Sequence, residues 1–215
     1  MKIMIIGATG MAGSAITTQA LAQGHTVTAI GRSAEKLATL TPNAHLTTVA
    51  KDAFTLTRAD LTAVDVVVDA MATPPAKAYL HVDLATKLVA MLRDTTAPRL
   101  VFILGAGSLK TGADQHLFVN DIAADPANTA FVSIPQSQLK ELTFLRTVDN
   151  VNWVGISPAA DFHAGPAVPV HLGTDDLYVN DQGISATNTG TMAVAVLNEV
   201  TQPAHHQTRF TVANQ

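Results

Sequence analysis

The chain has 215 residues, of which 47% are hydrophobic and 14% charged; this excludes a disordered chain and predicts one compact domain, residues 1–215. A net charge of -4 without any basic run excludes a nucleic-acid or anionic-membrane surface. Cysteine is absent, which excludes disulfides and thiolate chemistry, and no stretch is long and apolar enough to span a membrane. We therefore expect a cytoplasmic protein that acts on a small molecule.

The N-terminal segment has the pattern of a buried strand followed by a glycine-rich turn. Residues 3–6 form a continuous apolar run, typical of a parallel strand buried on both faces. The glycines that follow have GxxGxxG spacing and open an apolar helix, a context in which backbone amides approach a pyrophosphate at the helix N-terminus. We predict that the cofactor is bound here by Gly7, Thr9, Gly10, Met11 and Gly13. A glycine turn without a ligand is the alternative.

Strand and helix patterns then alternate along the chain. In chain order we expect a helix to residue 23, a strand at 26–30, a helix at 33–40, strands at 45–50 and 64–70 around a short helix at 55–61, a helix at 76–93, a strand at 99–104, a long loop at 110–135, a helix at 139–148 and a strand at 151–156. This alternation predicts an α/β fold with a parallel sheet.

The regular alternation weakens toward the C-terminus. Residues 176–185 resemble a small hairpin around Asp181, residues 187–200 have a helical pattern, and a last strand is expected at 208–212. We expect residues 161–186 to form a small lobe that covers the site.

Four segments resemble the atypical short-chain dehydrogenase/reductases, specifically the NADH-flavin reductase family beside biliverdin-reductase-B-like and NmrA-like proteins. They are GATGMAG at 7–13, Arg32 after the second strand, GAGSL at 105–109 and NWVGISPAADF at 152–162. The resemblance implies a Rossmann-like, doubly wound parallel sheet in the order 3-2-1-4-5-6, with helices on both faces and a small C-terminal lobe. The ligand is then expected at the carboxyl ends of the strands.

Residues at these strand ends complete the predicted site. Ala70, Met71 and Ala72 are expected to line the cofactor after the fourth strand, and Gly107 and Ser108 follow the fifth. The Ser108 hydroxyl is our candidate catalytic group, able to bond the nicotinamide or a substrate carbonyl; a turn-capping serine is the alternative.

Two more positions extend the predicted site at either end. The resemblance places Pro158 and Ala159 beside the nicotinamide. Asp52, after the third strand, is expected either to reach the adenine or to cap a helix.

The end of the second strand predicts which nicotinamide is bound. NAD-specific proteins place an acidic residue there to bond the ribose 2′-hydroxyl. This chain instead has Arg32 and Ser33, which can hold a 2′-phosphate by charge-assisted hydrogen bonds. We therefore expect NADP(H) to be favoured over NAD(H). The alternative is that Arg32 is only solvated and Ser33 only caps the next helix.

The chain lacks the tyrosine and lysine pair, Tyr-x-x-x-Lys, that supplies the catalytic acid in typical short-chain dehydrogenases. Neither tyrosine, Tyr79 or Tyr178, has a lysine four residues on, and the pair with that spacing is Gln136 and Lys140. Glutamine is no proton donor, so we expect a flavin (FMN or FAD) or a quinone as the small-molecule acceptor, because a flavin takes hydride at its own ring.

Other roles remain open or are excluded at this point. A non-catalytic NADP(H) sensor of the NmrA-like type is the alternative to an enzyme. Eight histidines are present but none are paired at helical spacing, so no metal site is predicted. The oligomeric state is left open, and a homodimer is compatible with the sequence.

Overall fold

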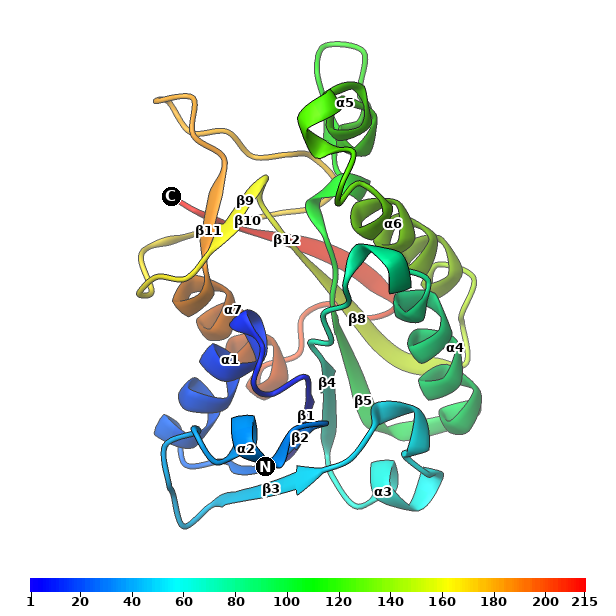
Figure 1. Ribbon diagram of the computed structural model, residues 1–215, viewed down its shortest axis with the longest axis vertical. Coiled ribbons are helices and arrows are strands. Elements are labelled where there is room, and N and C mark those ends of the chain that lie inside the picture. The colour runs from blue at the N-terminus through cyan, green and yellow to red at the C-terminus, as the bar shows by residue number, and fades with distance from the viewer.

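The computed structural model describes residues 1–215, in which eight strands form one main sheet (Figure 1). The sheet order is β10-β12-β8-β5-β4-β1-β2-β3, and only β10 runs antiparallel to its neighbour. Six of these strands give the expected 3-2-1-4-5-6 order, which confirms the Rossmann-like fold. The strands are β1 (Lys2–Ile6), β2 (Thr26–Gly31), β3 (Leu46–Ala50), β4 (Val66–Asp69), β5 (Thr95–Ile103), β8 (Val151–Pro158), β10 (Val170–Gly173) and β12 (Thr208–Asn214).

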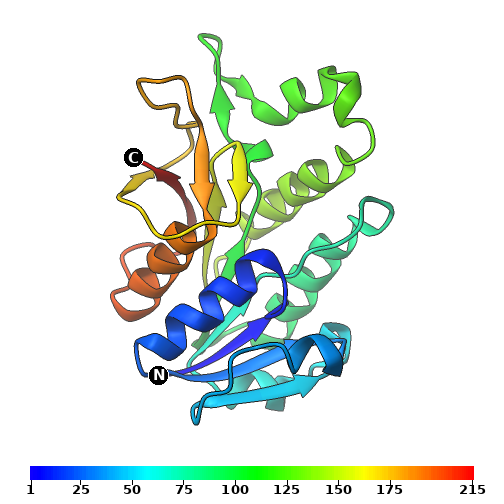
Figure 2. The same cartoon turned by 60° about the vertical axis from the view of Figure 1, so that its left-hand side comes forward.

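Helices cover both faces of the sheet, as Figures 1 and 2 show. On one face α1 (Met11–Ala22) packs against α7 (Thr189–Thr201), and on the other α4 (Leu80–Leu92) packs against α6 (Ser133–Leu145). The shorter helices are α2 (Ala34–Leu37), α3 (Arg58–Thr62) and α5 (Phe118–Ala124), and 3-10 turns are found at Ala53–Thr55, Pro75–Lys77, Ala106–Ser108 and Pro126–Asn128. None of the helices has the length and hydropathy that a bilayer crossing requires.

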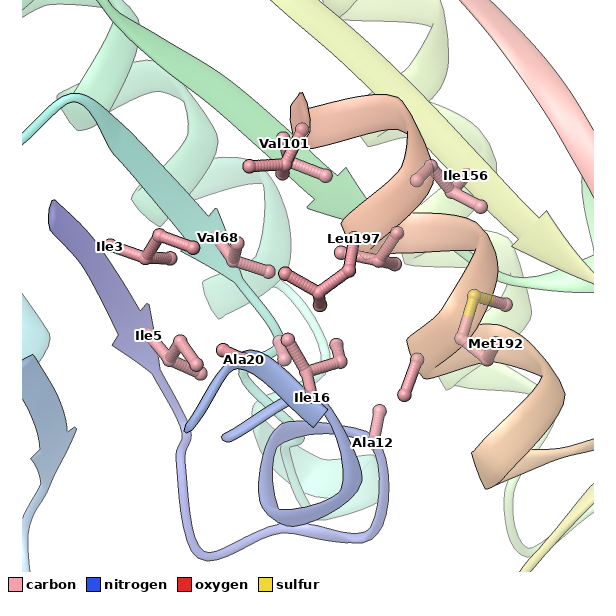
Figure 3. Close-up of a cluster of buried hydrophobic side chains, with 14 of the residues drawn as sticks. Ile3, Ile5, Ala12, Ile16, Ala20, Val68, Val101, Ile156, Met192 and Leu197 are labelled. Atoms are coloured by element: carbon pink, nitrogen blue, oxygen red, sulfur yellow. The ribbon is translucent and has the colours of Figure 1, made fainter. Parts of the chain in front are cut away.

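The apolar runs of the central strands supply two separate cores. Successive side chains point to opposite faces of a strand, so Ile3 and Ile5 join the cluster under α1 and α7, while Met4 and Ile6 join the one under α4 and α6. Figure 3 shows the first cluster, in which Ile16 of α1 and Met192 and Leu197 of α7 meet the sheet side chains. A strand with both faces covered explains why the N-terminal apolar run is continuous.

The region expected to be a long loop, residues 110–135, is more ordered than predicted. It contains the two-stranded sheet of β6 (Lys110–Thr111) and β7 (His116–Leu117), then α5, and the first turn of α6. A seven-residue helix is too short to show a period. Pro135 lies in the first turn of α6, where a missing N–H costs nothing, so the helix begins before the expected residue 139.

Other boundaries also differ from the predictions. β5 begins at Thr95, before Pro98, because the pairing with β8 is irregular between Thr95 and Leu100 and no ladder bond is required of the proline. Residues 180–184 form a turn without hairpin strands, closed by a hydrogen bond from the Gly183 amide to the Asn180 carbonyl.

Residues 161–186 contribute strands to two different sheets. They supply β10 to the edge of the main sheet and β9 (Asp161–His163) to a small parallel sheet with β11 (Ala186–Asn188). Because β11 takes residues 187 and 188, α7 begins two residues later than expected.

Candidate functional site

The glycine turn between β1 and α1 has no room for side chains at two of its positions. Gly7 has a φ of +76°, and a Cβ there would lie 2.5 Å from the Ala70 carbonyl oxygen. A Cβ at Gly13 would lie 2.2 Å from the Gly7 carbonyl oxygen, so glycine is required for α1 to pack against the turn. The turn is thereby held against the carboxyl ends of β1 and β4.

The N-terminus of α1 is open to a ligand. Gly10 is the N-cap residue, no side chain caps the helix, and no acidic residue lies in its first turn. The free amides and the positive end of a 12-residue helix favour an anion at this point. A dinucleotide pyrophosphate therefore fits the turn, because the Gly7 and Gly13 positions leave the backbone bare and the helix amides are not used by the protein.

A cavity of about 580 Å³ extends from this turn across the ends of β2 and β3. Four cationic side chains line this cavity, namely Arg32, Lys36, Lys51 and Lys77. Asp52 is the one acidic residue in the lining. In a chain with only 13 Lys and Arg residues and a net charge of -4, this is a local concentration of positive charge. Lys51 is partly neutralised by Asp60, 2.7 Å away, which leaves the other three to face a phosphate.

A second cavity, about 180 Å³, continues from the first. The two share Met71, Ala72 and Thr73, the loop that follows β4. Most of the residues that line the second cavity are apolar, and His81 and Gln138 are among its polar lining residues. Phe162 of β9 is one of the apolar lining residues. The pair of cavities forms one track over the glycine turn, with a charged end and an apolar end, which is the shape a dinucleotide requires.

The structure brings most of the predicted cofactor residues onto this track. Gly7, Thr9, Gly10, Arg32 and Asp52 line the larger cavity, Met11 and Ala70 line the smaller one, and Met71 and Ala72 line both. Gly13 lies behind the turn and acts through packing.

Two polar residues near the charged end also have structural roles. Ser33 Oγ accepts the Lys36 amide and caps α2, and Ser33 does not line the cavity. Asp52 both lines the cavity and caps the turn at Ala53–Thr55 by accepting the Phe54 amide.

Besides Gly13 and Ser33, four predicted residues lie outside both cavities: Gly107, Ser108, Pro158 and Ala159. Ser108 is 6% exposed, and its hydroxyl lies 3.3 Å from an Arg209 guanidinium nitrogen and 3.4 Å from the Gly105 carbonyl oxygen. The same arginine donates to Ser157 and pairs with Asp175, so it ties together β8, β12 and the segment before β11. The structure thus places Ser108 in a buried polar network that lines neither cavity, and its catalytic role stays a prediction.

Three buried ionisable groups beside the smaller cavity were not foreseen from the sequence. Asp69 ends β4, His81 lies in the first turn of α4, and Glu141 lies on the buried face of α6. His81 Nδ1 is 3.9 Å from Glu141 Oε2. Their positions carry a signal that could have identified them: His81 follows the same helical stripe as Leu84 and Leu88, and polar residues on an apolar stripe are unusual.

Burial sets the protonation of these groups. Burial raises the pKa of Glu141 well above its usual value, and the nearby Asp69 charge raises it further. Burial also raises the pKa of Asp69 to about 6, although the Met71 amide donates to its carboxylate, and it lowers the pKa of His81 to about 4. No group of three or more His, Asp and Glu side chains in the chain is arranged to hold a metal ion.

Comparison with known proteins agrees with this geometry. The model of a family described as NAD(P)H-binding matches residues 7–200. The chain belongs to this NAD(P)H-binding family. The YwnB protein of Bacillus subtilis (strain 168) is 35% identical over 217 residues, covering 100% of this chain and 99% of the relative.

Solved structures of similar proteins span the whole chain. A Lactobacillus casei protein is 40% identical with a TM-score of 0.92, covering 100% of this chain and 99% of the other. A Streptococcus pneumoniae protein described as "a putative NADH-flavin reductase" is 30% identical with a TM-score of 0.87, and each chain is covered completely. The family assignment and the Rossmann-like fold predicted from the sequence are therefore confirmed.

Proposed function

We propose that this NAD(P)H-binding protein is a reductase that favours NADP(H) and transfers hydride to a flavin or quinone-like acceptor. The observation that carries the proposal is the continuous track of two cavities, cationic at one end and apolar at the other, over an uncapped helix N-terminus. The similar Streptococcus pneumoniae protein, with its flavin reductase description, supports the same class of reaction.

The chain's own residues have distinct tasks in this proposal. The Gly7–Gly13 turn and the first amides of α1 bind the pyrophosphate, and Arg32 with Lys36 faces the adenosine end. Met71, Ala72 and Thr73 direct the dinucleotide from the larger cavity into the smaller one. When bound there, a reduced nicotinamide supplies hydride, and the apolar lining from Ile103, Leu104 and Phe162 excludes water from it.

The acceptor is tested by the oxidation of NADPH with different partners. We expect oxidation in the presence of FMN, FAD or a quinone such as menadione, and no reduction of NADP by simple alcohols, because no tyrosyl acid lies at the smaller cavity. Tyr79 lines the larger cavity and Tyr178 stacks on His171, with ring centroids 3.9 Å apart. Efficient alcohol oxidation with flavins and quinones inert would contradict the proposal.

The cofactor preference is tested at Arg32. A charge-assisted hydrogen bond of about 1.5–3 kcal/mol to the 2′-phosphate corresponds to a ten-fold or greater preference for NADPH. Arg32→Ala should weaken NADPH binding by about that factor and leave NADH binding nearly unchanged, as measured by calorimetry. Arg58→Ala, which removes an exposed arginine outside the cavity, is the matched control. Equal losses for both cofactors would show that Arg32 does not contact the 2′-phosphate.

A non-catalytic NADP(H) sensor is the second candidate function. It is favoured by one observation, that Gln136 and Lys140, which have the spacing of the usual catalytic pair, are exposed on α6 and do not line either cavity. NADPH binding without turnover of any flavin or quinone would support the sensor over the reductase.

A further inference from the structure

Three ionisable side chains from three elements meet beside the smaller cavity without a cation to balance them. Asp69, His81 and Glu141 are 6%, 5% and 3% exposed, respectively. No lysine or arginine forms an ion pair with either carboxyl group, and Asp69 is the one charged group that shifts the pKa of Glu141. Around them the cavity is lined by uncharged residues, among them Thr73, Ile134 and Gln138.

Stability does not account for this arrangement. Buried ionisable groups cost free energy unless they are paired and hydrogen-bonded, and apolar residues of similar volume are often more stable. Asp69 has a local task, since its carboxylate accepts the Met71 amide at 3.0 Å and shapes the loop shared by the cavities. His81 Nε2 and Glu141 Oε2, however, are buried with no hydrogen-bond partner in the protein. Groups of this kind in a cleft are candidates for chemistry.

Burial favours the uncharged form of both members of the pair. The raised pKa of Glu141 favours the protonated carboxyl group, and the lowered pKa of His81, about 4, keeps its imidazole neutral near physiological pH. Because Nδ1 faces Glu141 at 3.9 Å, the tautomer with its proton on Nε2 leaves Nδ1 able to accept from the carboxylic acid. The pair is then ordered as an acid, an imidazole and a free Nε2–H.

We propose, on the basis of the reductase function proposed above, that His81 donates a proton to the acceptor and that Glu141 replaces it through the imidazole. The acceptor gains hydride from the nicotinamide, which is oxidised by two electrons, and a proton from His81 Nε2. As that N–H bond breaks, the Glu141 proton moves to Nδ1. After the product leaves, water supplies a new proton to Nε2 and the Nδ1 proton returns to the Glu141 carboxylate, which restores the starting state. The separation of 3.9 Å must shorten by about 1 Å for a hydrogen bond to form, which requires a small rotation of either side chain.

This relay favours a quinone or another carbonyl acceptor over a free flavin. Hydride transfer to a quinone leaves negative charge on an oxygen atom, which a neighbouring acid stabilises in the transition state. A reduced flavin spreads the charge over its ring and tolerates later protonation from water. We therefore expect His81 to matter more for a quinone than for FMN.

The relay is tested with His81→Gln and Glu141→Gln in the intact chain. For both variants we expect kcat with menadione to fall about 100-fold, a smaller loss with FMN, and a KM and NADPH dissociation constant within about two-fold of wild type. Wild-type kcat should fall as pH rises through the pKa of Glu141, because the donor must be protonated, and Glu141→Gln should lose this dependence. His45→Gln, at an exposed histidine in the turn before β3, is the matched control.

A measurement without cofactor keeps the relay testable if a variant fails to fold. NMR of the imidazole nitrogens in the wild-type protein should show His81 neutral near physiological pH, with its proton on Nε2. A cationic His81, or a proton on Nδ1, would overturn the relay. So would a His81→Gln variant with wild-type kcat, although the reductase function would then stand. A wild-type protein that binds NADPH but reduces neither menadione nor FMN would overturn the reductase function and the relay together.

Discussion

Gly10→Val should abolish NADPH binding and leave a folded domain. Gly10 has an extended backbone, with a φ of -79° that any residue adopts, so valine brings no backbone strain. Its Cβ would lie 3.2 Å from the Gly7 carbonyl oxygen, which requires a shift of only a few tenths of an ångström. The rest of the side chain, however, would lie where the pyrophosphate approaches the first amides of α1. We expect a loss of at least about 100-fold in affinity, equivalent to about 2.7 kcal/mol.

Calorimetric titration with NADPH and thermal unfolding separate this effect from misfolding. The unfolding free energy of Gly10→Val should fall by only about 1 kcal/mol, the usual cost of a poor N-cap. Thr18→Val places a valine on the exposed face of the same helix, away from the cavities, and should bind NADPH as wild type does. Gly13→Ala, in contrast, should lower stability, because its Cβ would lie 2.2 Å from backbone. NADPH binding by Gly10→Val at wild-type affinity would contradict the assignment of the pyrophosphate site.

The parts of the site that the sequence predicted are those whose geometry is local. The Gly7–Gly13 turn follows its own strand and opens its own helix, so spacing alone determines the bare backbone and the free amides. Ala70 and Met71 lie at the end of a valine-rich strand, and parallel strands present their carboxyl ends at the same edge of the sheet. Arg32 lies one residue beyond β2 for the same reason.

The parts that the sequence did not predict depend on residues far apart in the chain. Ser108 is turned into the interior because Arg209, 101 residues away, contacts its hydroxyl. His81 and Glu141 meet because α4 packs against α6, and neither helix carries a pattern that identifies the other. A helical stripe shows that a polar residue is buried but does not show what it faces. Contacts between elements thus show that Ser108 belongs to a buried polar network, and local sequence patterns could not show this.

Glu199→Ala should cause a large loss of stability, about 3–5 kcal/mol, because it leaves a buried arginine without its partner. Arg99 of β5 and Glu199 of α7 are each 5% exposed, and the guanidinium lies 2.6 Å from Glu199 Oε1 and 2.8 Å from its carbonyl oxygen. Glu199 also accepts from His205 Nδ1 at 2.8 Å and from the amides of Ala204 and His205. This network joins the sheet to α7, the helix that packs against α1. Chemical denaturation would measure the loss of unfolding free energy.

The same pair gives a dependence of stability on pH with a definite sign. Burial alone would raise the pKa of Glu199, but hydrogen bonds from His205 and Arg99 bring it below 4.5. A carboxyl group whose pKa is lower in the folded state stabilises the protein above its unfolded pKa, and this stability is lost as pH falls through the folded value. The difference in unfolding free energy between wild type and Glu199→Gln should therefore shrink below about pH 4.5. The control Glu35→Gln, at an exposed acid in α2, should show no such change.

A double variant tests whether the loss in Glu199→Ala comes from the unpaired charge. Arg99→Met combined with Glu199→Leu should recover much of the stability lost in Glu199→Ala, because it leaves no unpaired charge. A double variant as unstable as Glu199→Ala would show that the loss comes from packing of the acidic side chain and not from the stranded guanidinium.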